Sequence, residues 1–230
     1  MISSLSFNET VERIKNWSNG EQTRLVFCCT LNEIMEAEEN VEFGKLLKAG
    51  DLLTPDGMPL VWWLRWQGKK VERVYGPEIL QKFIILNLKF KNRMVFVGDE
   101  KNRDFFEKYG DYIVMPMRQR FEKEDYDVLI KSIGKVSGGK IVWLGLGARK
   151  QIEVASELKR RKIGGVVVTV GAAFDFISGN KKQAPRWIRQ AGGEWLFRLI
   201  MEPKRLGQRY FKIISWLLRR ICGRKLQLIY

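Results

Sequence analysis

One aspartate and one arginine lie close together in the sequence at positions that suit chemistry. Asp56 follows a short apolar segment of strand length, residues 51–54, and is the centre of a Pro-Asp-Gly turn. In α/β proteins such a turn holds its carboxylate at a strand end that faces a cleft. Arg73 comes after an apolar, helix-like segment, residues 58–66, and just before a Gly-Pro turn that begins the next helix. An acid, an arginine and two turns therefore lie within about two dozen residues of each other, and the acid is expected to face a cleft.

The chain contains no histidine among its 230 residues. This excludes Ser-His-Asp and Cys-His catalysis and every histidine-based metal motif. Any general base must therefore be Asp, Glu, Lys, Tyr or Cys. The three cysteines, Cys28, Cys29 and Cys222, lack the spacing of a disulfide framework or a zinc site, and we interpret them as buried thiols in a reducing compartment.

Polar residues also follow the end of an earlier strand candidate. Thr30 and Asn32 come directly after the continuous apolar segment 24–29, and Asn32 can cap the helix expected over residues 32–48. The carboxyl ends of parallel strands face the ligand crevice of an open α/β sheet. Thr30, Asn32 and Asp56 are therefore expected on the same edge of the sheet.

A glycine-rich turn at residues 145–147 follows another strand candidate. It resembles part of a dinucleotide fingerprint, but Lys150 stands where a third glycine is needed, and no acidic residue ends the next strand. We interpret it as a strand-to-helix turn whose amides face the diphosphate of a nucleotide sugar. Gln151 either points its amide into that crevice or is a solvated helix residue. Asp175 is a second carboxylate on the crevice side, and we interpret it as fixing its loop.

These residues need a scaffold, and the rest of the chain provides one. Strand and helix candidates alternate at the spacing of βαβ units, which predicts an α/β fold, Rossmann-like and doubly wound, with a mostly parallel sheet. The predicted strands lie at residues 24–29, 51–54, 93–97, 112–115, 140–144 and 166–170. We expect a catalytic domain over residues 1–191 and a basic helical C-terminal appendage over residues 192–230.

The net charge of +15 is concentrated near the C-terminus. Residues 180–230 carry thirteen Lys and Arg against two Glu, a net charge of +11. This predicts an anionic partner for the tail, such as phosphate, nucleic acid or an anionic membrane surface. Nucleic acid is disfavoured because the body is nearly neutral and the basic residues accompany an apolar helix face.

A basic amphipathic helix is predicted over residues 210–222. Its apolar face contains Phe211, Ile214, Leu218 and Ile221, with Trp216 near the boundary between faces. Two structures fit this pattern: a helix lying in a membrane interface, and a helix packed on the sheet with a solvated basic face. The chain has neither a signal peptide nor an apolar segment of spanning length, so we expect a cytoplasmic protein that can be peripheral on the inner face of the plasma membrane.

From about residue 24 to about residue 211 the sequence resembles the WecG/TagA/CpsF family of bacterial glycosyltransferases, glycosyltransferase family 26. Several motifs carry the resemblance, in the right order. They are Thr-x-Asn at Thr30 and Asn32, PDGMPLVW around Asp56, ERVYGPE around Arg73, GLGARKQ ending in Gln151, GAAFDFISG, QAPRW and EWLFRLIMEPKR.

The resemblance implies an inverting transferase that needs no metal or other cofactor. Such enzymes move a sugar, typically N-acetylmannosamine or its uronic acid, from a UDP-sugar to a polyprenyl-diphosphate-linked sugar at the cytoplasmic membrane face. They act in teichoic acid, enterobacterial common antigen, capsule and exopolysaccharide synthesis. Homo-oligomers are possible, and the sequence does not identify the donor sugar.

The resemblance also implies roles for individual residues. Asp56 resembles the catalytic base. Thr30, Asn32, Gln151 and Arg73 resemble residues of the sugar-nucleotide pocket. Arg198, Arg205 and Arg209 fall in the appendage, where relatives place arginines that meet the diphosphate and the membrane.

The chain departs from the family pattern in two places. The turn over residues 147–152 lacks the usual proline and glutamate, and Glu78 stands where many relatives have Asp. These departures leave an alternative open: a catalytically inactive family member that binds anionic lipid or polysaccharide.

Overall fold

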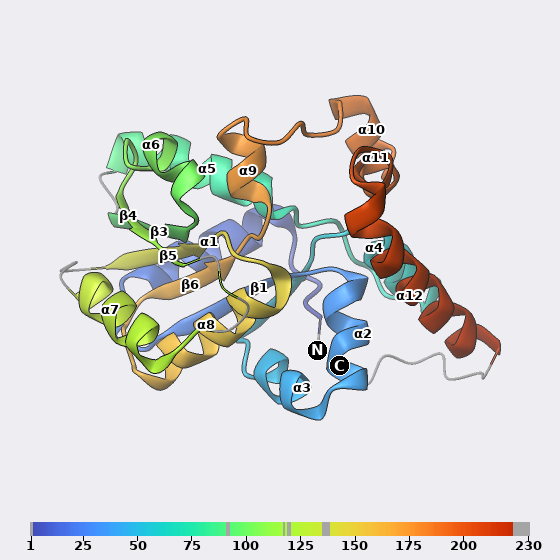
Figure 1. Ribbon diagram of the computed structural model, residues 1–230, viewed down its shortest axis with the longest axis horizontal. Helices are drawn as coiled ribbons and strands as arrows, with labels where there is room; N and C mark the ends of the chain where they lie inside the picture. The colour runs from blue at the N-terminus through green and yellow to red at the C-terminus, as the bar shows by residue number, and fades with distance from the viewer. Residues whose placement is uncertain (1, 91–92, 117, 119–120, 135–138, 223–230) are drawn as a thin grey trace.

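The computed structural model describes residues 2–90, 93–116, 118, 121–134 and 139–222. Within these residues one sheet has the strand order β2-β1-β6-β5-β3-β4, and every neighbouring pair is parallel (Figure 1). The strands are β1 (Arg24–Cys29), β2 (Leu52–Pro55), β3 (Arg93–Gly98), β4 (Asp111–Val114), β5 (Lys140–Leu144) and β6 (Val166–Thr169). The predicted α/β fold is confirmed, with a sheet that is parallel throughout.

The inner strands β1, β6, β5 and β3 are buried on both faces, which explains why their sequences are continuous apolar runs. In β1, Leu25, Phe27 and Cys29 belong to the core on one face, whereas Val26 and Cys28 belong to the core on the other. A strand covered on both sides needs apolar residues at every position.

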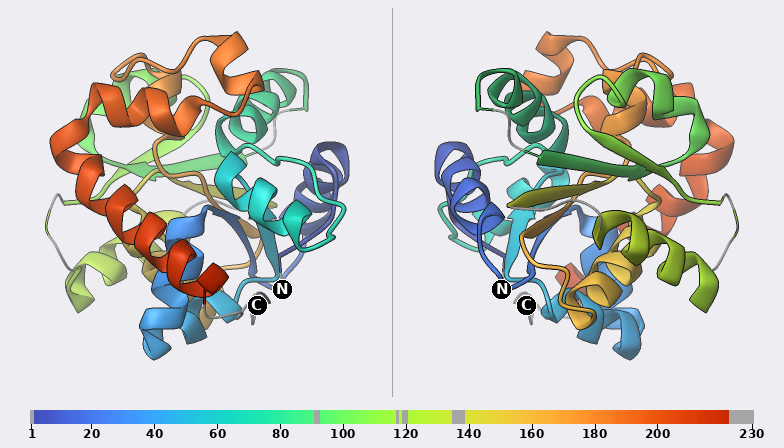
Figure 2. Two further views of the ribbon diagram at one scale, coloured as in Figure 1. Left: turned by 90° about the vertical axis from the view of Figure 1, so that its right-hand side faces the viewer. Right: turned by 90° about the vertical axis from the view of Figure 1, so that its left-hand side faces the viewer.

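Helices cover both faces of the sheet (Figure 2). The first face is covered by α2 (Leu31–Glu39), α3 (Val41–Lys48), α4 (Met58–Trp66), α7 (Lys123–Gly134) and α8 (Ala148–Arg160). The second face is covered by α1 (Phe7–Ser18), α5 (Gly76–Phe90), the short 3-10 helix η1 (Glu100–Asn102) with α6 (Arg103–Phe106), and α9 (Ala173–Ile177). The chain leaves β1 towards the first face and the adjacent β6 towards the second, so the connections diverge there and leave room for a ligand.

The region predicted as one helix over residues 32–48 contains two. Asn40 interrupts it with an extended backbone, and its side chain accepts a hydrogen bond from the Phe43 amide at 2.9 Å. Thr30, and not Asn32, caps α2: the Thr30 hydroxyl accepts from the Asn32 amide at 3.2 Å, and Glu33 accepts from the Thr30 amide at 2.8 Å. The prediction that Asn32 caps this helix was wrong because a Thr with Glu three residues later forms a complete capping box.

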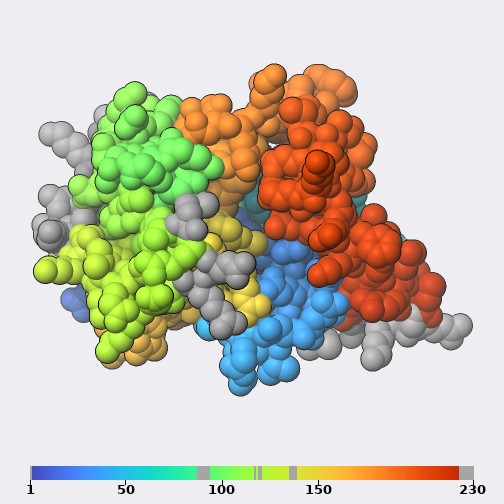
Figure 3. Space-filling view, in the orientation of Figure 1, coloured from blue at the N-terminus to red at the C-terminus, as the bar shows by residue number. Residues whose placement is uncertain are grey.

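The C-terminal segment forms three helices, α10 (Arg186–Gln190), α11 (Glu194–Met201) and α12 (Pro203–Cys222). Figure 3 shows their orange and red atoms covering one end of the molecule. Helix α12 packs on α2 and α4. The Trp216 ring lies 6.2 Å from the Trp63 ring, and the Trp216 indole donates to Glu38 at 3.0 Å. Arg220 forms an ion pair with the same Glu38.

The face of α12 that contacts the body differs from the predicted apolar face. Ile213 and Trp216 are buried, whereas Phe211 is 73% exposed and Leu218 is 56% exposed. Periodicity identified an apolar stripe, but the aromatic contact and the Glu38 pair determine which side docks. Residues 223–230, with Arg224 and Lys225 of the predicted basic tail, lie outside the described residues.

Candidate active site

A cavity of about 810 Å³ opens at the carboxyl edge of the sheet. Its floor contains residues that directly follow the strands: Thr30 after β1, Asp56 after β2, Asp99 after β3, Gly145 after β5 and Val170 after β6. Helices α4, α11 and α12 form the facing wall. The structure brings all the predicted site residues to this cavity: Asp56, Thr30, Asn32, Arg73, Gln151, Arg198, Arg205 and Arg209.

Asp56 sits where β2 gives way to α4. Its amide donates to the Cys29 carbonyl at 2.9 Å, which extends the β1–β2 pairing to this residue. Gly57 begins α4 and packs against Thr30, since a Cβ there would lie 3.3 Å from the Thr30 side chain. The Asp56 Oδ1 atom is buried and has no hydrogen-bond partner among the described residues. Asp56 lines the cavity, and this oxygen of its carboxylate is not satisfied by the described part of the protein.

The surroundings of Asp56 bring its acidity close to neutrality. Burial raises the pKa of Asp56 to about 7, and the Glu194 carboxylate adds to the rise. The Arg73 guanidinium and the Gly76 backbone amide oppose it, lowering the pKa. A carboxylate with a pKa near 7 can take a proton from an attacking hydroxyl group at physiological pH, which is the property a general base needs.

Arg73 holds the backbone beside Asp56. Its Nε donates to the Asp56 carbonyl at 2.6 Å, and its Nη2 donates to Glu194 at 2.7 Å. Its guanidinium also lies over the Tyr75 ring, 3.8 Å from the ring centre. Arg73 lines the cavity but makes these contacts within the protein, so it fixes the geometry around Asp56.

Glu194 is a site residue that sequence reasoning missed. It comes from the first turn of α11, is 6% exposed, and accepts from Arg73 and, at 2.6 Å, from the Tyr75 hydroxyl. Burial and the nearby Glu194 carboxylate raise the pKa of Tyr75, so this hydroxyl remains a donor. Glu194 therefore ties the appendage to the floor of the cavity. The available signal was an acidic residue that begins a mostly apolar helix after two glycines.

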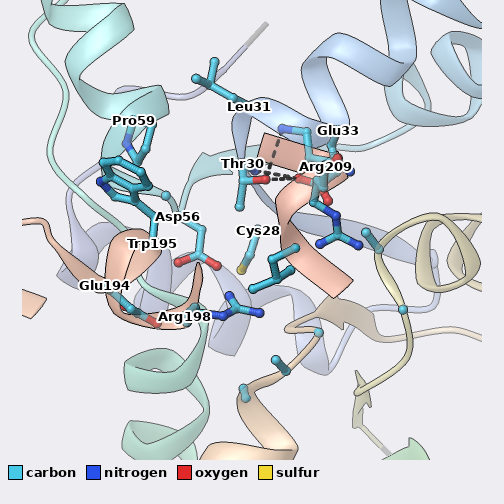
Figure 4. Close-up of a pocket in the computed structure, with 18 of the residues that line it drawn as sticks. Cys28, Thr30, Leu31, Glu33, Asp56, Pro59, Glu194, Trp195, Arg198 and Arg209 are labelled. Atoms are coloured by element: carbon cyan, nitrogen blue, oxygen red, sulfur yellow. Dashed lines mark hydrogen bonds between the residues drawn. The ribbon is translucent and has the colours of Figure 1, made fainter. Parts of the chain in front are cut away.

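Two of the appendage arginines point into the cavity. Figure 4 shows the side chains of Arg198 and Arg209 directed towards the same space as the Asp56 carboxylate. Arg198 Nε is buried without a hydrogen-bond partner among the described residues. Arg205 pairs with Glu202 at the rim. Guanidinium groups that face an open space are suited to bind a phosphate or diphosphate.

Gln151 is buried beside the crevice and is not a solvated helix residue. It is 4% exposed, and its carbonyl oxygen accepts from the Gly171 amide at 2.9 Å. The interpretation as a solvated helix residue was therefore wrong. This bond joins the first turn of α8 to the loop after β6, at the edge of the cavity that Gln151 lines.

The turn after β5 has structural reasons for its composition. A Cβ at Gly145 would lie 2.4 Å from the Phe174 ring, so close packing requires glycine there. Arg149, where relatives have proline, pairs with Glu36 at 2.9 Å and Glu153 at 2.8 Å. The altered residue therefore holds α8 to α2, away from the cavity.

Asp175 fixes its loop, as interpreted from the sequence. It accepts from Asn102 at 3.1 Å and pairs with Lys101 at 3.0 Å and Lys181 at 3.3 Å. Although burial opposes it, these contacts hold the pKa of Asp175 below its ordinary value. Glu78, the other departure, pairs with Arg189 at 3.4 Å and is not among the residues that line the cavity.

The described residues contain no group of three or more Cys, Asp and Glu side chains placed to hold a metal ion. They also contain no helix long and apolar enough to cross a membrane. The cavity thus contains the Asp56 carboxylate with its raised pKa, the Arg73–Glu194 ion pair beside it, and further arginines from α11 and α12. Over residues 1–229 the sequence matches the family model described as glycosyl transferase WecG/TagA/CpsF. The chain therefore belongs to the WecG/TagA/CpsF glycosyl transferase family.

Proposed function

We propose that the enzyme transfers a sugar, N-acetylmannosamine or a related hexose or uronic acid, from a UDP-sugar to a polyprenyl-diphosphate-linked saccharide. Its family membership supports a role as a cell-wall glycosyltransferase. The products are teichoic acid, capsule or exopolysaccharide precursors. The observation that carries the proposal is the Asp56 carboxylate, whose pKa is about 7 and whose buried Oδ1 has no hydrogen-bond partner in the described part of the chain, in a cavity that also contains Arg198 and Arg209.

In the proposed reaction the acceptor hydroxyl attacks the anomeric carbon of the donor from the side opposite UDP. A new carbon–oxygen bond forms, Asp56 takes the hydroxyl proton, and the bond between the anomeric carbon and the β-phosphate oxygen breaks. UDP leaves with the electron pair of that bond, and the negative charge that develops on it is stabilised by Arg198. The anomeric configuration is inverted because one displacement occurs.

Thr30, Asn32 and Gln151 are proposed to contact the sugar nucleotide. Thr30 caps α2 and Asn32 lies in its first turn, and both residues line the cavity. Gln151 contributes its amide from the opposite side, beside the turn after β5. Arg205 is proposed to meet the acceptor diphosphate at the rim.

The pH dependence of transfer follows from the acidity of Asp56. Because the base must be deprotonated, we expect kcat/KM to fall as pH decreases below about 7, approaching a tenfold loss per pH unit, and to level off above it. Initial rates at constant ionic strength measure this. A profile that stays flat from about pH 5 to about pH 8 would remove Asp56 from the role of base.

The appendage, residues 192–230, is proposed to hold the enzyme on the inner face of the plasma membrane. Large apolar side chains are exposed on α11 and α12, among them Ile200 at 69%, Phe211 at 73% and Leu218 at 56%. Basic side chains of the same helices, such as Lys204 and Lys212, can interact with anionic lipid. An apolar face with basic neighbours is typical of interfacial helices, and each basic residue near an anionic surface contributes about 1 kcal/mol.

Flotation with liposomes tests this attachment. The combined change Ile200→Ser, Phe211→Ser and Leu218→Ser is expected to lower the fraction bound to liposomes containing anionic lipid at least about fivefold, because it removes apolar area from the interface. The control is Val41→Ser with Val128→Ser, which removes side chains that are 71% and 63% exposed on the body of the protein. Equal loss in both variants would contradict attachment through the appendage.

Transfer itself is tested with a panel of UDP-sugars and polyprenyl-diphosphate-linked GlcNAc and related acceptors. We expect one UDP-sugar to add a single sugar to the lipid, detected by mass spectrometry, with release of one UDP. If a folded, liposome-bound enzyme transfers from no donor and binds no UDP-sugar in titration, the alternative of an inactive lipid- or polysaccharide-binding protein is favoured.

A further inference from the structure

One row of residues on α12 changes from basic to aliphatic along the wall of the cavity. The row is Arg205, Arg209, Ile213, Leu217 and Ile221, and all five line the cavity. Residues four apart on an α-helix lie on the same face, one above the other. The same ridge is therefore cationic near Asp56 and aliphatic further along the helix.

Helix α4 faces the aliphatic part of this ridge with aromatic residues. Trp62, Trp63 and Trp66 line the same cavity. Trp63 is buried between Trp66, at 5.2 Å, and Trp216 of α12, at 6.2 Å between ring centres. Trp62 and Trp66 remain 44% and 57% exposed, which is a large apolar area for side chains at the mouth of a cavity.

We call this part of the cavity the apolar arm and define it by six residues. They are Trp62, Trp66, Ile213, Ile214, Leu217 and Ile221. From Arg209 to Ile221 the helix advances about 18 Å, which is long enough to contact an extended apolar chain. Figure 1 shows α12 running beside α4 and away from the sheet.

The polar end of the arm specifies what kind of ligand fits. A free sugar or a nucleotide sugar would satisfy the arginines but leave the aromatic and aliphatic walls in contact with water. A simple hydrocarbon would fill the arm but leave the arginines without an anion. A ligand with a diphosphate at one end and a long apolar chain at the other complements both parts.

We infer that the apolar arm binds the first isoprene units of a polyprenyl diphosphate, with the diphosphate at Arg205 and Arg209. This inference rests on the proposed function and adds a lipid-chain site to it. The chain would then run along α12 towards Ile221, and the sugar on the diphosphate would be directed back towards Asp56. The arm is distinct from the exposed face formed by Phe211 and Leu218, which do not line the cavity.

Titration with soluble diphosphates of increasing chain length tests the inference without depending on transfer. The probes are inorganic diphosphate, geranyl diphosphate and farnesyl diphosphate, followed by calorimetry below their micelle-forming concentrations. For the wild-type protein we expect affinity to rise at least about tenfold from inorganic diphosphate to farnesyl diphosphate, since apolar area is buried with each unit. The arm variant, Trp66→Ser with Ile214→Ser and Ile221→Ser, is expected to lose this gain and keep its affinity for inorganic diphosphate.

The matched control is Phe211→Ser with Leu218→Ser, which changes similarly exposed residues of the same helix outside the cavity. It is expected to keep the gain with chain length. Equal affinity of the wild type for all three probes, or equal loss in the arm and control variants, would overturn the inference. If binding depends on chain length but no sugar is transferred, the proposed function is contradicted and the lipid-chain site is supported. If sugar is transferred but binding does not depend on chain length, the lipid-chain site is contradicted and the proposed function is supported.

Discussion

Replacing Asp56 by Asn is expected to lower the rate of sugar transfer at least about a thousandfold, because a hydroxyl group is a poor nucleophile when no base accepts its proton. Asparagine has nearly the same shape but cannot accept the proton. The Kd for the UDP-sugar should change less than about threefold, since the Arg73 contact is made to the Asp56 backbone and is retained. Single-turnover rates and calorimetric titration measure the two quantities.

The same substitution is expected to stabilise the protein. The pKa of Asp56 is raised from 3.8 to about 7, so between these values the folded protein keeps a proton that the unfolded chain loses. The free energy of unfolding therefore falls as pH rises through this window, and this loss of stability is complete above about pH 7. Because asparagine does not ionise, Asp56→Asn avoids this loss and should raise the free energy of unfolding at pH 8 by about 2 kcal/mol.

Asp51, at the other end of β2, supplies the control. Although burial opposes it, hydrogen bonds from Lys159 and the Leu25 amide hold the pKa of Asp51 below its ordinary value. Asp51→Asn should therefore destabilise the protein by about 1 kcal/mol and leave the rate of transfer nearly unchanged. If Asp56→Asn behaves like Asp51→Asn in both respects, Asp56 is a structural residue.

Replacing Glu194 by Ala is expected to have the second-largest effect. It leaves the mostly buried Arg73 guanidinium and the Tyr75 hydroxyl without their acceptor. Breaking a buried ion pair by removing one partner costs about 3 to 5 kcal/mol of stability. Because Arg73 also holds the Asp56 backbone, we expect transfer to fall at least about a hundredfold. Thermal unfolding and initial rates measure the two effects.

Glu39 provides a matched control because it also joins the appendage to the body. Its side chain is 52% exposed and lies 3.5 Å from Arg219 of α12. Glu39→Ala should change stability by less than about 1 kcal/mol, as is usual for exposed pairs.

A milder variant, Glu194→Gln, removes the charge that adds to the rise in the pKa of Asp56 and should move the acid limb of the pH profile to lower pH. An unmoved limb would contradict electrostatic coupling between Glu194 and Asp56.

Much of the scaffold could be predicted because its signals are local. The segments 24–29 and 140–144 are strands with the expected bounds, and 58–66 is the expected helix. Each is a continuous apolar run bounded by turn residues or polar residues, which defines its limits without tertiary information. The crevice position of Asp56 followed from the same rule, since parallel strands end on the same edge.

The features that the sequence did not reveal depend on contacts between distant residues. Glu194 reaches Arg73 and Tyr75 across more than a hundred positions, and Lys101 reaches Asp175 across more than seventy. The docking side of α12 is another example, because the Glu38 contact that selects it lies 178 residues from Trp216. Periodicity identifies the faces of a helix, but the partner residues determine which face is buried.

The anomeric configuration of the first product formed by the wild-type enzyme tests the central claim most directly. The account holds that Asp56 acts once, as a base, while Glu194 is occupied by Arg73 and Tyr75 and cannot serve as a nucleophile. Proton NMR of the product formed from the accepted UDP-sugar should therefore show the configuration opposite to that of the donor. Retention of the donor configuration would require a covalent or front-side mechanism and would contradict Asp56 as the base of a single displacement.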